Sequence, residues 1–227
     1  MQPQLVVFDL AGTTVKDNQD VHKVLQAALA KVGVHISMEE ANLIMGIPKP
    51  VAIRQLLEDK NYKGITNELI DKIHSDFVRQ MVSFYESDES VGEKEGVSET
   101  FAVLKAKGIK VAVDTGFDRP ITNAVLKRMG WVEKKLIDTS VTSDEVEQGR
   151  PAPDLIYEAM KRTGVASAVN VAKVGDTASD MNEGTRAGCQ WVVGVTTGSY
   201  SREGLMREPH THLIDQLPDL LPILGIS

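Results

Sequence analysis

Cysteine, aromatic residues and long apolar runs are all scarce in this sequence. Cys189 is its only cysteine, and aromatic residues make up 5% of its 227 residues. A single cysteine cannot form a disulfide within the chain, so we expect a reducing, cytoplasmic location. No apolar run approaches the roughly 20 residues of a membrane-spanning helix. Residues 1–7 also lack the charged start and apolar stretch of a signal peptide, so no membrane partner is expected.

Basic residues are outnumbered by acidic ones, 25 to 32, which gives a formal net charge of −7 and an isoelectric point near 5.3. Binding to nucleic acid needs a basic face, so no nucleic-acid partner is expected. An anionic substrate would have to be attracted by a few local cations. The length and a hydrophobic share of 42% suffice for an α/β core with a smaller insertion.

What the sequence does contain is a set of polar residues at the ends of apolar runs. Residues 5–8, Leu-Val-Val-Phe, run directly into Asp9, which predicts a buried strand with Asp9 at its C-terminal tip. Ligands bind at that edge of open α/β sheets. The alternative is a turn or helix-cap aspartate, because Asp-x-x-Gly often ends a strand.

Two further segments carry groups suited to a phosphoryl ligand. Residues 109–113 predict a strand that is followed by Asp114, Thr115 and Gly116. Thr115 offers a hydroxyl group and Gly116 an exposed amide. Asp114 could face either the site or solvent. Arg150 stands between Gly149 and Pro151, and its planar guanidinium can hold an anion with two hydrogen bonds. The alternative for Arg150 is a surface residue before a helix over 152–162.

A last pair of carboxylates follows the strand predicted over 171–174. Asp176 and Asp180 are four residues apart, on the loop and in the first turn of a predicted helix over 179–187. Hard oxygen ligands at this spacing suit Mg²⁺. Asp180 also suits the N-terminal end of a helix by its charge, and both roles can hold together.

The remaining patterns define the fold. Helices over 100–107 and 120–129 and a strand over 110–113 extend an alternation of strands and helices, which predicts a doubly wound α/β core with a parallel sheet. We assign this core to residues 1–15 and 91–227, and an all-helical domain to residues 16–90. The first strand is not followed by Gly-x-Gly-x-x-Gly, which argues against a dinucleotide-binding site. Trp191 is expected in the core, and His210 and His212 on the solvent face of a strand.

The inserted helical domain has three apolar stripes at helical spacing and one loop punctuated by glycine and proline. That loop runs from Met45 to Pro50 and contains Lys49, which could equally be an exposed loop lysine. The stripes are Val24, Leu25, Ala28 and Leu29; Ile53, Leu56 and Leu57; and Ile70, Ile73, Phe77, Met81 and Phe84.

Together, the four strand-end segments between Asp9 and Asp180 resemble the motifs of the haloacid dehalogenase (HAD) superfamily. This resemblance implies a HAD-like Rossmannoid core, a cap formed by the inserted helices, and a hydrolase. It also implies that Asp9 is a nucleophile toward phosphorus and that Thr115 and Gly116 bind the phosphoryl oxygens. By the same resemblance, Arg150 supplies the cation for catalysis and substrate binding.

The resemblance implies a magnesium cofactor as well. Its direct ligands would be Asp9, the backbone carbonyl of Ala11, and Asp176, while Asp180 would act mainly from behind them. The substrate would be a small phosphonate or phosphate. The resemblance is compatible with a homodimer.

Three features narrow the resemblance to phosphonoacetaldehyde hydrolases (phosphonatases) and their relatives. Ala11 stands where HAD phosphatases carry a second aspartate, Arg150 replaces the usual lysine, and Met45 and Lys49 fit Met-Gly-x-x-Lys in the cap. In this family the lysine forms a Schiff base with the substrate aldehyde. An iminium accepts the electrons of the broken carbon–phosphorus bond, so no acid is needed at position 11. Met45 is expected to contact the substrate.

Two positions depart from the phosphonatase pattern. Ala52 stands where the family has a histidine, and Gln19 where it has a cysteine. These departures favour the sister group of phosphonatase-like hydrolases. Three functions therefore remain open: cleavage of a carbonyl phosphonate, a phosphatase for a small phosphomonoester such as phosphoglycolate, and a catalytically silent protein that binds a phosphorylated ligand. The nucleophile argues against the last of these.

Overall fold

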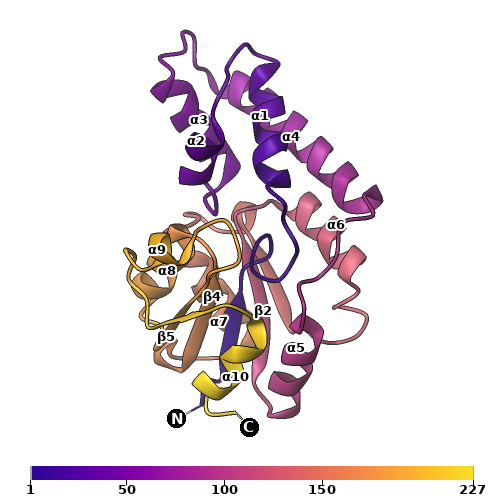
Figure 1. Ribbon diagram of the computed structural model, residues 1–227, viewed down its shortest axis with the longest axis vertical. Helices are drawn as coiled ribbons and strands as arrows, with labels where there is room; N and C mark the ends of the chain where they lie inside the picture. Colours follow the sequence, from indigo (N-terminus) through magenta and orange to yellow (C-terminus); the bar gives the residue numbers. More distant parts are fainter. Residues whose placement is uncertain (1, 227) are drawn as a thin grey trace.

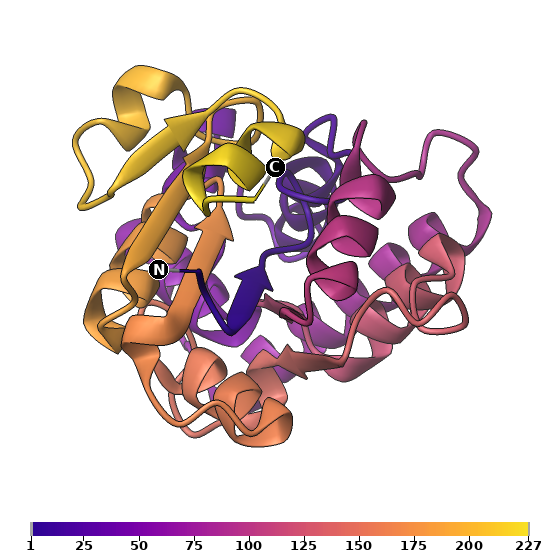
Figure 2. The ribbon, with the colours of Figure 1, turned by 90° about the horizontal axis from the view of Figure 1, so that it is seen from below.

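The computed structural model describes residues 2–226, in which six strands form one parallel sheet in the order β3-β2-β1-β4-β5-β6. This confirms the predicted α/β class with a doubly wound parallel sheet, because β1 lies centrally and helices cover both faces (Figure 2). The strands are β1 (Leu5–Phe8), β2 (Lys110–Thr115), β3 (Thr139–Thr142), β4 (Val171–Gly175), β5 (Trp191–Val195) and β6 (His212–Ile214).

Both faces of β1 are buried, which explains its continuous apolar run. Val6 and Phe8 face the layer that contains α5, where the rings of Phe8 and Phe101 lie 4.8 Å apart. Leu5 and Val7 face the opposite layer, which contains α7. The helices of the core are α5 (Val97–Ala106), α6 (Arg119–Met129), α7 (Asp154–Thr163), α8 (Ala178–Ala187), α9 (Arg202–Leu205) and α10 (Leu220–Ile223), with short 3-10 turns at Ser143–Glu145, Ala168–Asn170 and Leu217–Asp219.

Four helices occupy the insertion, and Figure 1 shows them gathered at one end of the sheet, opposite the two chain termini. They are α1 (Asp20–Ala30), α2 (Met38–Leu43), α3 (Lys49–Asp59) and α4 (Asn67–Ser87). The two segments that connect these helices to the core lie side by side, because the N–H of Lys16 donates to the carbonyl of Gly92 and the N–H of Lys94 donates to the carbonyl of Thr14. Where the boundary between core and cap falls remains a prediction. We call residues 16–90 the helical insertion.

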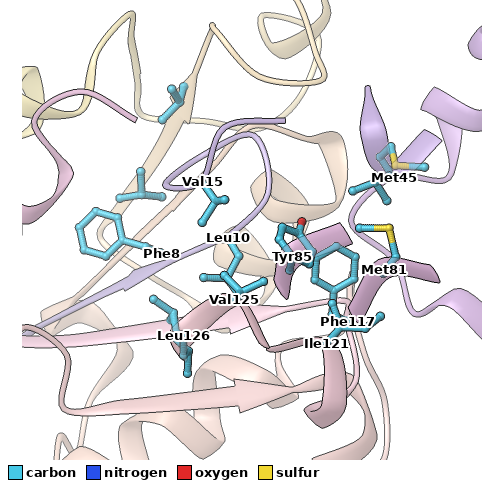
Figure 3. Packing of buried hydrophobic residues seen from close by; sticks show 14 of the residues in the cluster. Phe8, Leu10, Val15, Met45, Met81, Tyr85, Phe117, Ile121, Val125 and Leu126 are labelled. Carbon is cyan, nitrogen blue, oxygen red and sulfur yellow. The ribbon is translucent and has the colours of Figure 1, made fainter. Parts of the chain in front are cut away.

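The apolar core continues from the sheet into the helical insertion. Phe117, on the loop between β2 and α6, meets Tyr85 of α4 edge to face at 6.0 Å, and Met45 and Met81 lie beside it (Figure 3). The insertion also touches the backbone of the core, since a Cβ added to Gly116 would lie 2.6 Å from the carbonyl oxygen of Gly46. The insertion is therefore packed closely over the strand ends.

The structure corrects several details of the predicted elements. Helix α7 begins at Asp154 and not at residue 152, because the N–H of Ala152 forms a turn to Gly149 instead. Lys49 is the first residue of a helix and not part of a loop. Near the end of α4 the buried aromatic residue is Tyr85, which packs against Phe117, whereas Phe84 is only half-buried.

His210 precedes β6 and is half-buried, so its expected place on the solvent face of a strand was wrong. Trp191 and His212 lie where the sequence placed them. Trp191 is buried in β5, and His212 is exposed in β6. No helix within residues 2–226 is long and apolar enough to cross a membrane.

Candidate active site

The predicted strand-end residues meet because β1, β2 and β4 are neighbours and run parallel. Asp9 directly follows β1, Thr115 is the last residue of β2, and Asp176 directly follows β4. A cavity of about 30 Å³ lies between these ends and the helical insertion. Its lining consists of Asp9, Ala11, Asp17, Val21, Met45, Gly46, Lys49, Thr115, Gly116, Phe117, Thr177 and Ser199.

A cluster of buried carboxylates lies at the core side of this cavity. Asp9, Asp176 and Asp180 each offer an oxygen, and these atoms lie within 4.8 Å of one another. Asp176 accepts hydrogen bonds from the Thr13 hydroxyl at 2.7 Å and from the backbone of Ser199 at 2.6 Å. Gly12 has φ +91°, and a Cβ there would lie 2.4 Å from Asp176 Oδ2, so glycine is required beside this carboxylate.

Two of the three carboxylates, Asp9 and Asp176, have raised pKa values, whereas Arg150 and Lys173 lower the pKa of Asp180. Burial raises the pKa of Asp9 to about 8; Arg150 opposes the rise, and Asp180 and Asp176 reinforce it. Burial likewise raises the pKa of Asp176 to about 6, with Asp180 adding to the effect. Crowded hard oxygen donors with elevated pKa values suit a divalent cation such as Mg²⁺. Ala11 lines the cavity beside them.

Arg150 lies at the centre of a second, fully buried charge cluster. Its Nη1 lies 2.6 Å from Asp9 Oδ1 and 2.9 Å from Asp180 Oδ1. Its Nε lies 2.9 Å from Glu183 Oε2, and Nη2 contacts Asp114. The guanidinium thus fixes the carboxylate of Asp9 from behind, and its direct contact with a substrate stays a prediction. Asp114 is buried here and does not face solvent.

Two members of this cluster, Lys173 and Glu183, were not identified from the sequence. Lys173 lies in the middle of β4 and is completely buried; its Nζ is 3.0 Å from Glu183 and 3.2 Å from Asp180, and it also contacts Asp114. Burial, together with the neighbouring Asp114, raises the pKa of Glu183 to about 8. The sequence did contain one signal for Lys173, because a lysine inside a strand that is buried on both faces must be paired with an acidic group.

Thr115 and Gly116 lie at the cavity as the sequence predicted. The Thr115 hydroxyl oxygen accepts the N–H of Phe117 at 3.1 Å, so its own proton remains available for an anionic oxygen. Thr177 closes the other side and caps α8, where its hydroxyl donates to Asp180 at 2.6 Å. The hydroxyl groups of Thr115 and Thr177 therefore both lie at the cavity.

Lys49 lies at the opposite side of the cavity and is 3% exposed. Its Nζ lies 5.8 Å from the ring centroids of both Phe77 and Phe117. Burial lowers the pKa of Lys49 to about 8; Asp9 and Asp17 oppose the decrease, and Arg150 adds to it. Its place at the first residue of α3 also disfavours a positive charge. The sequence could not show this desolvation, because the two rings come from distant segments.

The two positions that depart from the phosphonatase pattern differ in location. Ala52 is buried one turn after Lys49 on α3. Gln19 is exposed, has φ 64°, and caps α1 outside the cavity lining. Asp17, which the sequence reading did not single out, lines the cavity instead.

Comparison with known proteins identifies the family to which this chain is similar. The family model described as haloacid dehalogenase-like hydrolase matches residues 6–194. A phosphonoacetaldehyde hydrolase of Bacillus cereus is 34% identical over 218 residues, which cover 92% of this chain and 81% of that protein.

Two solved structures, each 22% identical, support the fold. A phosphonoacetaldehyde hydrolase-like protein from Oleispira antarctica has a TM-score of 0.83, covering 99% of this chain and 92% of the other. A hydrolase from Pseudomonas syringae has a TM-score of 0.87, covering 99% and 100%.

Proposed function

The chain belongs to the haloacid dehalogenase-like hydrolases, and we propose that it cleaves the carbon–phosphorus bond of a small phosphonate that bears a carbonyl group. Phosphonoacetaldehyde or a close analogue is the proposed substrate. The observation that carries this proposal is the cavity itself, which has Asp9 on one side and the desolvated amine of Lys49 on the other.

At the carbonyl end, the neutral amine of Lys49 attacks the substrate carbon and forms an imine with loss of water. Protonation of this imine gives an iminium, which withdraws electrons from the neighbouring carbon–phosphorus bond. When that bond breaks, its electron pair becomes the carbon–carbon double bond of an enamine. The enamine takes up a proton at carbon, and hydrolysis of the resulting iminium releases the aldehyde and restores Lys49.

At the phosphorus end, the Asp9 carboxylate attacks and becomes an acyl phosphate, which water then hydrolyses. Arg150 orients Asp9 through the contact at 2.6 Å. Thr115 and Gly116 donate hydrogen bonds to the phosphoryl oxygens. Mg²⁺, held by Asp9, Asp176 and the Ala11 carbonyl with Asp180 behind them, would supply positive charge to these oxygens.

Ala11 supports this chemistry over that of an ordinary phosphatase. A phosphate ester needs a proton on its leaving oxygen, and the methyl group of Ala11 cannot provide it. An enamine leaves without one, because the iminium has already accepted the electrons. Hydrolysis of a small phosphomonoester is the competing function.

The test is a comparison of phosphonoacetaldehyde and related carbonyl phosphonates with small phosphate monoesters, including phosphoglycolate, by steady-state phosphate release. Lys49→Arg keeps the charge but cannot form the imine, so it should abolish carbon–phosphorus cleavage. Lys60→Arg, at the other end of α3, is the matched control and should retain activity. Brisk ester hydrolysis that survives Lys49→Arg would favour the phosphatase.

A further inference from the structure

Imine chemistry requires a proton carrier at the carbonyl end of the cavity. Water leaves the carbinolamine only after the carbinolamine hydroxyl is protonated. When the product iminium is hydrated, a proton must be removed from the attacking water. Neither Ala11 nor Ala52 can supply it. His74, on α4, pairs with Asp118 at 3.6 Å and does not line the cavity. Burial raises the pKa of Tyr85 well above 10, so its hydroxyl is a poor acid near neutrality.

Asp17 is the remaining titratable side chain of the cavity lining. Within residues 2–226, the lining contains only two other titratable groups, Asp9 and Lys49. Asp9 is the proposed nucleophile and is already paired with Arg150. Asp17 lies on the segment that connects β1 to α1 and lines the same cavity as Lys49, whose pKa its charge raises.

The carboxyl group of Asp17 is held in place by the start of α1. Its Oδ1 accepts the backbone N–H of Asp20 at 2.7 Å and that of Val21 at 3.4 Å. Within residues 2–226, no group donates a hydrogen bond to its second oxygen, Oδ2. One oxygen therefore anchors the group while the other can serve the cavity.

The surroundings also favour proton transfer at this position. Burial raises the pKa of Asp17, which brings its titration closer to neutrality; the two N–H groups and His22 oppose the rise. Asp17 and Lys49 influence each other, since the carboxylate favours the charged amine. Asp17 and Lys49 therefore line one cavity with pKa values that are both shifted toward neutrality.

We propose that Asp17 is the catalytic acid and base of imine formation and hydrolysis at Lys49, an assignment that rests on the proposed function. Asp17 in its acid form donates a proton to the carbinolamine hydroxyl, the carbon–oxygen bond breaks, and water leaves. The nitrogen lone pair forms the carbon–nitrogen double bond. Water protonates the enamine at carbon, and the hydroxide that this leaves is neutralised by the proton released when the acyl phosphate is hydrolysed. The Asp17 carboxylate then takes a proton from the water that attacks the product iminium, which gives a carbinolamine and restores the acid form of Asp17. The carbon–nitrogen bond of this carbinolamine breaks as its hydroxyl proton moves to the nitrogen, which releases the aldehyde and the neutral amine of Lys49.

The test isolates this step by trapping the imine with acetaldehyde and cyanoborohydride, so that no phosphorus chemistry is involved. Reductive ethylation of Lys49 is followed over time by mass spectrometry in the wild type, Asp17→Asn and Asp17→Ser. Both variants retain an oxygen that can accept the N–H groups of α1. Asp20→Asn, a position paired with exposed Lys23, is the control.

Loss of a catalytic acid should slow trapping by about 100-fold in both Asp17 variants. Added formate should restore part of the rate in Asp17→Ser, and Asp20→Asn should behave like the wild type. Equal trapping rates in wild type and Asp17→Asn would overturn the role of Asp17. Slow trapping that formate does not restore would assign Asp17 to holding α1 and would also overturn it. An absence of trapping in the wild type would instead refute the proposed function.

Discussion

The lowered pKa of Lys49 gives a prediction that can be worked out quantitatively. With a pKa of about 8 in place of 10.5, about 9% of the amine is neutral at pH 7, roughly 300-fold more than in an unperturbed lysine. Between pH 8 and pH 10 the neutral fraction then rises only about twofold, whereas that of an ordinary lysine rises about 75-fold. Reactivity that depends on the neutral amine should therefore level off above pH 8.

Competitive labelling with trace acetic anhydride measures this directly, because only the neutral amine reacts. The Lys49 peptide is quantified by mass spectrometry from pH 6 to pH 11 in the native protein and in denaturant, where the same residue serves as its own control. Asp9 and Asp17 both raise the pKa of Lys49, so Asp9→Asn and Asp17→Asn should move the plateau to lower pH. Native labelling that keeps rising through pH 10, as in denaturant, would refute the desolvation of Lys49.

Three further predictions concern the carboxylates and the buried cluster. Asp9→Asn should lower turnover by about 10⁴-fold or more while leaving the circular dichroism spectrum unchanged, because the covalent nucleophile is lost. Chelation should reduce phosphate release to background and added Mg²⁺ should restore it, since the carboxylate cluster offers hard ligands; full turnover without a divalent cation would contradict this. Lys173→Met leaves Arg150 as the only cation on the buried carboxylates of Asp114, Asp180 and Glu183 within the described residues, and should destabilise the fold by about 3 kcal/mol or more. Lys161→Met, at a surface pair, should change stability by less than about 1 kcal/mol, and both are measured by denaturant unfolding.

The sheet and the position of the strand-end residues could be predicted because they follow from local patterns. Apolar runs mark buried parallel strands, and parallel strands present their C-terminal ends at one edge. Asp9, Thr115 and Asp176 each stand at such an end, so their proximity follows from strand order alone.

The buried cluster around Arg150 could not be predicted, because its members are brought together only by the tertiary fold. Asp114 comes from β2, Lys173 from β4 and Glu183 from α8, and no sequence spacing relates them. The desolvation of Lys49 could not be predicted either, because it depends on aromatic rings supplied by α4 and by the loop after β2. Sequence identified the candidate groups for the proposed chemistry, and packing determines their charge states.

The most direct test of the central claim is reduction of the protein by borohydride in the presence of phosphonoacetaldehyde. Asp9→Asn is the preferred form of the protein, because it should form the imine but not transfer the phosphoryl group. We expect a covalent adduct on the peptide that contains Lys49, with the mass of the reduced, intact phosphonate. No adduct with any carbonyl phosphonate, together with undiminished hydrolysis of phosphate esters by Lys49→Arg, would contradict the account.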